Sequence, residues 1–528
     1  MTQAVRYVLI LCGGLALAFF LGLGGVPLFD LDEGAFSAAT WEMLQRGDFI
    51  TTYLNGEPRF DKPILIYWLQ ALSVTLVGVN EWGFRLPSAL AATCWALSLY
   101  AFARPRLGRE AALSAALMLA FAAVSWVIGR AATADALLNL LITLTLLDIY
   151  RVWERVAAMP TTAAEAVRLQ RGLIVRVFFW MGLGFLTKGP VAIAIPLVVS
   201  GLFFISTGTW RAWLRAVLHP WGWLVFLGVA LPWYILEYQA QGQAFIDGFF
   251  VEHNIGRFTD TMEKHGGLLL YYFPVILVIL LPFTSLFLRI LPRLPALRDE
   301  PLDRFLWLWF GFVFVFFSFS STQLPHYLLY GGSALLLLMA RYRQDLQTRW
   351  LAYLPAFLAF ALLLGLPDIA AWLGTLTEDA YVSAMLARSP AITDWRYYAW
   401  VASGFCGLLV LALWPRLSPW RGLLAAGALQ ALVLSQAVVP WAAAVQQQPV
   451  VEAAQRATTL DKPVVMAGVN MPSFTVYRGA VTPRRSPEPG EVVFTRVHKL
   501  DRWPAAQLLY RAGGVALLAL PEDIQSPE

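Results

Sequence analysis

Apolar runs of about 20 residues recur along most of the chain, and they restrict its fold more than any other feature. A helix of this length crosses the hydrocarbon core of a bilayer and satisfies its backbone hydrogen bonds internally. Of the 528 residues 59% are hydrophobic and 14% are charged, whereas soluble domains carry about 25% charged residues. We therefore predict an all-α polytopic membrane protein.

The apolar runs predict about thirteen membrane spans. The first run follows a single basic residue, Arg6, and has no convincing small-residue cleavage site, so we expect an uncleaved span and not a signal peptide. The predicted spans lie near residues 7–26, 86–103, 111–129, 135–152, 173–189, 190–206, 221–238, 268–290, 305–320, 324–340, 350–367, 398–414 and 420–443.

Basic residues gather in the short loops between these spans, and the clusters fall on one side if the N-terminus is cytoplasmic. The net charge of +5 is therefore a topology signal, and nucleic-acid binding is not expected. The apolar segment 63–79 cannot cross the membrane in this arrangement, because crossing would turn every later basic loop outward. We predict an external loop over 27–85 with interfacial helices near 33–46 and 63–79, and further external loops over 239–267 and 368–397.

The composition changes after residue 443. Charges, prolines and short β-type runs at 463–466 and 491–494 replace the long apolar segments. We predict a transmembrane domain over 1–443 and a small external α/β domain over 444–528. The three cysteines, Cys12, Cys94 and Cys406, all lie inside apolar runs, so neither a disulfide framework nor a thiolate zinc site is supported.

The first candidate site residues are Asp32 and Glu33, just after the first span. Carboxylates at a membrane surface are costly unless they serve a purpose. Two interpretations stay open. The acids could cap the interfacial helix and complement its dipole, or one could act as a general base on an acceptor hydroxyl or position a nucleophile.

Asp61 and Lys62 lead into the second interfacial helix. Lys62 is either a snorkelling interfacial lysine or an ammonium that binds the phosphate of a lipid-linked substrate, with Asp61 to orient it. Asp135 opens the fourth span on the same external side, as a helix cap or as a partner of Asp32. Such a carboxylate pair is a weak signal for a divalent cation.

Further basic residues are predicted on the external face, in segments 186–190 and 252–265. An anionic substrate would explain them, and contact with lipid headgroups is the alternative. Segment 320–327 joins two spans externally and could be a simple polar hairpin. No P-loop, Rossmann glycine pattern, His-Glu-x-x-His or nucleophile elbow occurs in a supporting context, so soluble nucleotide chemistry is not expected. The basic external residues are Lys188, His253, Arg257, Lys264 and His265.

These motifs, in this order, resemble the aminoarabinose transferase (ArnT) and protein O-mannosyltransferase-like group of GT-C glycosyltransferases. The resemblance covers most of the chain. It rests on residues 27–43, Gly47 and Asp48, and 55–68, and continues through 129–135, 187–190, 253–258 and 324–327. Two positions depart from the pattern: Gly34 and Ala35 stand where the group tends to have Arg-Tyr, and Gln323 stands where it often has Lys.

The resemblance implies a GT-C fold, with interfacial helices over an outward-facing cavity. It also implies an inverting transfer from an undecaprenyl- or dolichyl-type phosphate sugar to a lipid A, glycan or protein acceptor. By resemblance Asp32 is the catalytic aspartate, with Glu33 beside it, and Asp135 is the second acid. The donor phosphate would be held by residues of the matched motifs, namely Arg59, Asp61, Lys62, Lys188, His253, Arg257 and Tyr327.

We expect a multi-pass protein of the bacterial inner membrane, with a cytoplasmic N-terminus and a periplasmic C-terminal domain. Its partners would be the lipid-linked donor, the acceptor and membrane lipids, and we expect a monomer. No cofactor is certain, and Asp32, Asp135 and His265 are weak candidates for a divalent metal. The alternative function is a transporter or flippase for a lipid-linked sugar, which would need charged residues near mid-membrane and often an inverted repeat.

Overall fold

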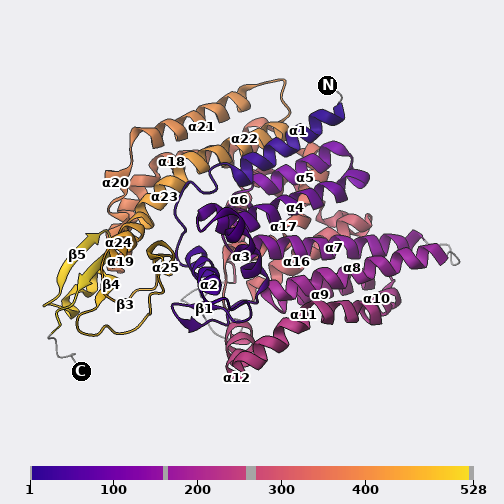
Figure 1. The fold of residues 1–528 in the computed structure, drawn as a ribbon. Helices are drawn as coiled ribbons and strands as arrows, with labels where there is room; N and C mark the ends of the chain where they lie inside the picture. The colour runs from indigo at the N-terminus through magenta and orange to yellow at the C-terminus, as the bar shows by residue number, and fades with distance from the viewer. Residues whose placement is uncertain (1–2, 159–163, 257–268, 523–528) are drawn as a thin grey trace.

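The computed structural model describes residues 3–158, 164–256 and 269–522. Helices run side by side through most of the molecule, and a small sheet lies at one end of them (Figure 1). The first half of the chain contains α1 (Gln3–Leu15), α2 (Asp32–Arg46), α3 (Leu65–Val77), α4 (Glu81–Leu107), α5 (Arg109–Phe121), α6 (Ala123–Ile128), α7 (Asp135–Ala158), α8 (Ala164–Lys188), α9 (Val191–Ser206), α10 (Trp210–Val217), α11 (Pro220–Gln241) and α12 (Gln243–Phe245).

The second half of the helical region ends close to the sheet. It contains α14 (Tyr272–Ile279), α15 (Thr284–Ile290), α16 (Pro301–Ser318), α17 (Leu329–Arg341), α18 (Arg349–Leu376), α19 (Ala380–Leu386), α20 (Ser389–Ile392), α21 (Trp395–Leu413), α22 (Pro419–Val433) and α23 (Val439–Gln446). Short turns of other helix types link some of these elements, among them η1 (Ala16–Phe20), η2 (Ile246–Ile255), η5 (Pro325–Leu328), η6 (Arg343–Asp345) and η7 (Leu434–Val438).

Among the residues that the structure describes, six helices are by themselves long and apolar enough to cross a membrane. They are α4, α7, α16, α18, α21 and the continuous stretch Pro419–Gln446. The bent pair α10 and α11, with 45° between its parts, would make a seventh, and Val5–Phe20, Leu65–Val77 and Val191–Ser206 are shorter apolar helices. The all-α membrane class is confirmed, whereas the figure of about thirteen spans stays a prediction.

Two predicted spans are not continuous helices. The run 111–129 is broken at Ala122, and the run 268–290 is broken between α14 and α15. The breaks meet, because the Ala123 N–H donates to the Leu281 carbonyl at 2.9 Å and Gln430 Nε2 donates to the same carbonyl at 3.2 Å. Backbone N–H and C=O groups without a helical partner are tolerated at membrane depth where other parts of the protein form hydrogen bonds to them. The contact between the two breaks provides such hydrogen bonds.

The segment predicted as the first external loop forms the two expected helices, and α2 and α3 pack against each other. Between them lies a short hairpin of β1 (Tyr53–Leu54) and β2 (Glu57–Pro58), which turns through Asn55 and Gly56 at positive φ. Thr40 Oγ1 on α2 donates to Gln70 Oε1 on α3 at 2.7 Å, and Gln70 Nε2 donates to the Ala132 carbonyl at 3.2 Å. These buried contacts fix both helices over the ends of the bundle.

The predicted external loop 368–397 begins later than expected. Helix α18 continues through Pro367 to Leu376, and α19 and α20 fill the rest of the segment. Pro367 has no N–H for the Leu363 carbonyl four residues earlier, and the Tyr397 hydroxyl donates to that carbonyl at 2.7 Å. A proline inside a membrane helix is tolerated where a neighbouring side chain satisfies the nearby backbone, so it was a poor signal for the end of this helix.

The chain ends in a small domain with a four-stranded sheet of order β3-β4-β6-β5. β3 and β4 are parallel, and the other neighbours are antiparallel. Helix α25 of this domain packs on α2, so the end of the chain lies against its first external loop. The elements are α24 (Gln448–Thr458), β3 (Val464–Met466), α25 (Ser473–Arg478), β4 (Val492–Arg496), η8 (Val497–Arg502), β5 (Gln507–Ala512) and β6 (Val515–Ala519).

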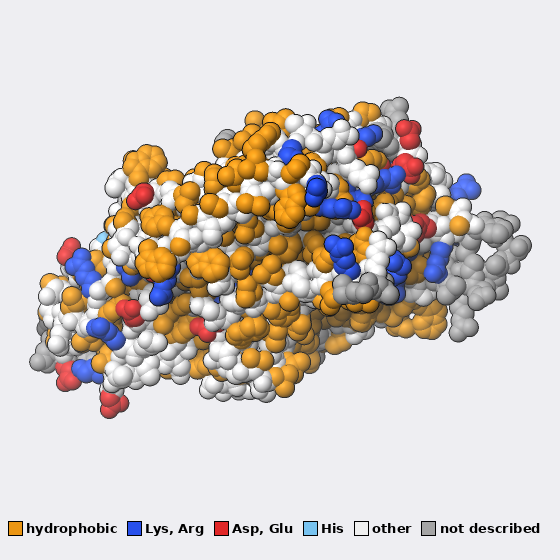
Figure 2. Space-filling view, turned by 90° about the horizontal axis from the view of Figure 1, so that it is seen from above, with side chains coloured by type: hydrophobic (Ala, Val, Ile, Leu, Met, Phe, Trp, Pro, Cys, Tyr) orange, Lys and Arg blue, Asp and Glu red, His pale blue; other side chains and the backbone are white. Residues whose placement is uncertain are grey.

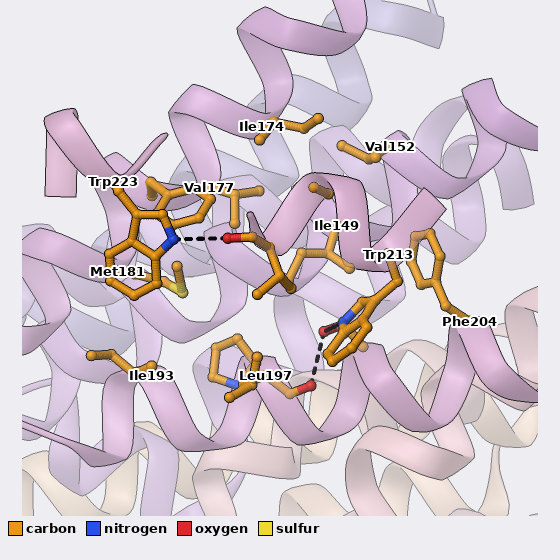
Figure 3. A pocket seen from close by; sticks show the side chains of 15 residues that line it. Ile149, Val152, Ile174, Val177, Met181, Ile193, Leu197, Phe204, Trp213 and Trp223 are labelled. Atoms are coloured by element: carbon orange, nitrogen blue, oxygen red, sulfur yellow. Dashed lines mark hydrogen bonds between the residues drawn. The ribbon is translucent and has the colours of Figure 1, made fainter. Parts of the chain in front are cut away.

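The outer surface matches a membrane protein. In the face drawn in Figure 2, charged side chains lie mostly toward the two ends and the middle is largely hydrophobic. Inside the bundle, an apolar cavity of about 140 Å³ lies among α7, α8, α9, α10 and α11 (Figure 3). Trp213 Nε1 donates to Ser200 Oγ at 2.9 Å at its edge. The described residues that line this cavity are apolar apart from Ser200 and the tryptophans.

Candidate functional site

Glu33 is buried and holds the first external loop to the bundle. Arg85 of α4 donates to its two oxygens, from Nε at 2.8 Å and from Nη2 at 2.7 Å. The amides of Phe29 and Ala132 donate to the same carboxylate at 2.9 and 2.8 Å. Burial alone would raise the pKa of Glu33, but the Arg85 charge and these donors hold it below its usual value. With its oxygens occupied, Glu33 is suited to a structural role and poorly placed for proton transfer.

Asp32, one residue earlier, has the opposite environment. It lies exposed in the first turn of α2, and in the described part of the chain its carboxylate has no hydrogen-bond or ion-pair partner. It lines a cavity of about 380 Å³ together with Asp135 and His326. A carboxylate that is open to a cavity is available to a substrate, which the paired Glu33 is not.

Asp135 lies at the start of α7, where three segments meet. Lys188, at the end of α8, donates to Asp135 Oδ1 at 2.5 Å, and the Tyr330 hydroxyl of α17 donates to the same oxygen at 3.2 Å. His326 Nε2 lies 3.6 Å from it. Asp135 was predicted as a partner of Asp32. The two carboxylates line the same cavity, but the direct ion-pair partner of Asp135 is Lys188.

A second cavity, of about 80 Å³, lies on the other side of the Asp135–Lys188 pair and is rich in cationic and phenolic groups. Lys188 also contacts two aromatic faces, with Nζ 5.4 Å from the ring centre of Tyr327 and 5.8 Å from that of Tyr330. The polar and aromatic lining is Asp61, Lys62, Lys188, His253, Phe317, Ser320, Thr322, Tyr327 and Tyr330. The structure thus brings four external segments of the sequence analysis to one place.

Asp61 organises the cationic side of this second cavity. Arg59 Nη2 donates to Asp61 Oδ2 at 2.6 Å, and Lys62 Nζ donates to the Asp61 carbonyl at 2.9 Å and lies 3.4 Å from Oδ2. Burial would raise the pKa of Asp61, but the charges of Arg59 and Lys62 hold it well below its usual value. The ionised carboxylate therefore orients Lys62, as the sequence suggested.

Three predicted basic residues, Arg257, Lys264 and His265, lie outside the described residues. Within the described ranges, no group of three or more metal-ligating side chains comes together. His326 and Tyr330 were not predicted as site residues, although His326 lies in segment 320–327, which was expected to join two spans. A histidine at the external end of a predicted span was the signal that could have identified it.

The C-terminal domain also contacts the segment that carries Asp32. The Ser473 amide and hydroxyl donate to the Asp30 carboxylate at 3.0 and 2.5 Å. The Tyr477 hydroxyl accepts from the Leu28 amide at 2.6 Å and donates to Glu81 at 2.9 Å. No sequence signal pointed to these contacts, because the partners lie more than 390 residues apart.

Comparison with known proteins agrees with this architecture. The family described as "Dolichyl-phosphate-mannose-protein mannosyltransferase" matches residues 61–236. An uncharacterized protein of Aquifex aeolicus is 32% identical over 348 residues, which are 66% of this chain and 76% of that protein. The undecaprenyl phosphate-alpha-4-amino-4-deoxy-L-arabinose arabinosyl transferase of Serratia proteamaculans is 29% identical over 62% of this chain, and the match spans 58% of its own length.

Among solved structures, ArnT from Cupriavidus metallidurans, crystallised with undecaprenyl phosphate, matches over 100% of both chains with a TM-score of 0.77 and 22% identity. At this identity the likeness concerns the fold. This bundle of apolar helices with its small C-terminal sheet has the fold of the GT-C class of membrane glycosyltransferases. Within that class, the chain belongs to the family of ArnT and the protein O-mannosyltransferases.

Proposed function

We propose that this protein transfers a sugar from a polyprenyl-phosphate carrier, of the undecaprenyl type, to an acceptor at the outer face of the bacterial inner membrane. The observation that carries the proposal is the pair of neighbouring cavities with different chemistry. One is lined by Lys62 and Lys188, and the other by the unpaired Asp32 carboxylate. Asp135 and Lys188 stand between them.

The cavity with Lys62 and Lys188 suits the donor phosphate. Two ammonium groups at the edge of a membrane bind a phosphate as compact point charges, and Asp61 keeps Lys62 oriented toward the cavity that both line. Tyr327 and Tyr330 border the same space. When the bond between the anomeric carbon and the phosphate oxygen breaks, these cations stabilise the departing phosphate anion.

The cavity with Asp32 suits the acceptor. An acceptor oxygen attacks the anomeric carbon from the side opposite to the phosphate, which inverts the configuration. If the acceptor is a sugar or protein hydroxyl, Asp32 takes its proton; if it is a lipid A phosphate, the group is already ionised and Asp32 acts by positioning. Arg130, mostly buried at the edge of this cavity, is suited to an anionic acceptor group.

The two roles are tested by separating binding from transfer. We expect Asp32→Asn to lower sugar transfer by about 100-fold or more while undecaprenyl phosphate still binds, because the variant loses the base and keeps the cations. Lys62→Met should weaken undecaprenyl phosphate binding to the purified chain in nanodiscs. Transfer is measured by mass spectrometry of lipid-linked sugars, membrane lipids and surface glycans in cells that carry each variant.

Matched controls are available on the C-terminal domain. Asp501 and Lys462 are exposed there, and Asp501→Asn and Lys462→Met should leave transfer and binding unchanged. Normal turnover in the Asp32→Asn variant would overturn the role of Asp32. Movement of undecaprenyl phosphate across the bilayer by the wild-type chain without sugar transfer would instead favour the flippase alternative.

A further inference from the structure

A large cavity lies between α1, α5 and α22, far from the candidate site. The three helices are neighbours in Figure 1, and the cavity between them measures about 640 Å³. Helix α17 connects the two regions. Tyr330, next to its first residue, contacts Asp135 of the candidate site, and Arg343 lies just beyond its last residue, at the cavity. Since α17 has 13 residues, the regions are separated by about 20 Å along its axis.

The inner walls of this groove are apolar and built around two glycines of α1. A Cβ on Gly14 would lie 2.5 Å from Leu117 Cδ2, so α1 and α5 are in close contact there. A Cβ on Gly13 would meet no atom within 4 Å, so that side of α1 faces open space. The apolar lining is Ile10, Leu17, Leu113, Leu117, Phe121, Leu424, Ala425 and Ala428. A space of this shape next to the hydrocarbon core suits an acyl chain.

The mouth of the groove is polar and carries an excess of positive charge. Glu110 accepts from Arg421 at 2.7 Å, from Tyr7 at 3.4 Å and from Arg343 at 3.5 Å. Arg6 lines the same mouth and has no ion-pair partner among the described residues. Two guanidinium groups thus contact the one carboxylate, and a third lines the same mouth. A separate cavity of about 440 Å³ adjoins the mouth of this groove and shares Glu110, Trp420 and Arg421 with it.

Two buried donors at this mouth lack acceptors. Ser418 Oγ lines the adjoining cavity, and Arg343 Nε belongs to a side chain that is only 8% exposed; neither has a hydrogen-bond partner. Trp420 lies between the guanidinium groups of Arg343 and Arg421, at 4.8 and 5.0 Å from its ring. Buried donors without acceptors are costly, and an anionic oxygen would satisfy them.

We propose that this groove binds an anionic phospholipid of the leaflet opposite the candidate site. One acyl chain lies between α1 and α22 beside Gly13, and the headgroup phosphate lies at Arg421, within reach of the Ser418 hydroxyl. The excess of positive charge at the mouth selects an anionic headgroup over a zwitterionic one. The site is separate from the donor cavity, and it does not depend on the proposed transfer reaction.

The test compares an anionic and a zwitterionic phospholipid that have the same acyl chains and differ in the headgroup. The full chain is delipidated in detergent and titrated with phosphatidylglycerol or phosphatidylcholine carrying the same acyl chains, and bound lipid is counted by native mass spectrometry. We expect phosphatidylglycerol to bind more tightly. Arg421→Gln should weaken its binding by about fivefold, the usual contribution of one basic side chain near an anionic lipid, and should weaken phosphatidylcholine, whose choline cation offsets its phosphate, by a smaller factor.

Further variants separate the tail from the headgroup. Gly13→Leu fills the open side of α1 and should weaken binding of both lipids through the acyl chain. Ser418→Ala should also weaken both, but through the phosphate, which the two headgroups share. Arg416 is exposed in the loop just before α22 and lines neither cavity, so Arg416→Gln is the matched control and should change nothing. Thermal unfolding of each variant shows whether it is folded.

Three outcomes would overturn the proposal. The first is equal affinity for the two phospholipids, and the second is an Arg416→Gln effect as large as that of Arg421→Gln. The third is displacement of phosphatidylglycerol by undecaprenyl phosphate at equal concentration in the wild-type chain but not in the Gly13→Leu variant. That result would assign the groove to the carrier lipid.

Discussion

Gly34 occupies a position where any side chain would collide with two other parts of the protein. A Cβ there would lie 1.9 Å from Asp30 Oδ1 and 2.8 Å from the Ser473 amide nitrogen. The first contact is with its own loop, and the second is with helix α25 of the C-terminal domain. The departure from the Arg that related sequences tend to have at this position therefore has a structural reason in this chain, since α25 approaches α2 at this glycine.

Replacement of this glycine should loosen the junction. We expect Gly34→Ala to lower the free energy of unfolding by about 1–3 kcal/mol, the usual cost of forcing a group into a packed site. Thermal unfolding of the purified protein in detergent measures the change. Gly13→Ala is the control, because its Cβ would enter open space, and it should be neutral or slightly stabilising. Equal melting temperatures for wild type and Gly34→Ala would contradict the packing argument.

Asp30 should make stability depend on pH. Burial raises the pKa of this carboxyl from 3.8 to about 7, although the hydrogen bonds from Ser473 oppose the rise. Between these pH values the native state keeps a proton that the unfolded state releases, so the stabilisation is complete below about pH 4 and is lost as pH rises through 7. We expect Asp30→Asn to flatten the decline of the melting temperature between pH 5 and 8. Parallel profiles would contradict this assignment.

At the scale of elements, the segment 27–31 is held by the C-terminal domain as well as by the bundle. Tyr477 ties the Leu28 amide to Glu81, and Ser473 ties Asp30 to α25. The segment leads directly into the first turn of α2, where Asp32 lies. The domain therefore positions Asp32 without touching the cavity, and its contribution should be visible in the rate of transfer and not in donor binding.

We expect Tyr477→Phe to lower the rate of sugar transfer by about tenfold or more, because small displacements of a reacting group are costly. Binding of undecaprenyl phosphate should be unchanged, since Lys62 and Lys188 are not affected. The comparison variant is Tyr510→Phe, which removes a 2.7 Å hydrogen bond to Glu452 within the same domain but away from the loop. If the two variants lose activity equally, the effect is one of general stability.

Sequence reasoning predicted elements well where the signal was local. The helices of the external loop, expected near 33–46 and 63–79, form at Asp32–Arg46 and Leu65–Val77, because apolar length and loop charge are properties of the segment itself. The breaks at Ala122 and around Leu281 were not predicted. Each is stabilised by the other and by Gln430, and such partners cannot be recognised from the apolar run alone.

The same distinction applies to the candidate site. Asp32, Asp61, Lys62, Asp135 and Lys188 were identified from external ion-bearing segments and from resemblance, and they line two adjoining cavities. The sequence could not separate Glu33 from Asp32, because two adjacent acids look equivalent until one of them meets Arg85. It could not indicate Ser473 or Tyr477, whose relevance depends on a contact between the two ends of the fold.

At the scale of the whole molecule, the apolar bundle separates two charged ends, and the orientation of the ends is a prediction that can be measured. A cysteine-free background is made by replacing Cys12, Cys94 and Cys406 with alanine. In intact cells of a strain with a permeable outer membrane, a membrane-impermeant maleimide should label Asp461→Cys in the C-terminal domain. It should label Thr348→Cys, exposed before α18, only after the inner membrane is opened. The reverse pattern would place the candidate site on the cytoplasmic face.

The contact between residues 27–31 and helix α25 has a consequence for how the protein is made. Residues 27–31 leave the ribosome early, but Ser473 and Tyr477 are synthesised more than 440 residues later. Membrane insertion can therefore be almost complete while the segment before Asp32 still lacks its final supports. A chain cut short by a stop codon before α25 would enter the membrane without these supports, so we expect it to be inserted and inactive.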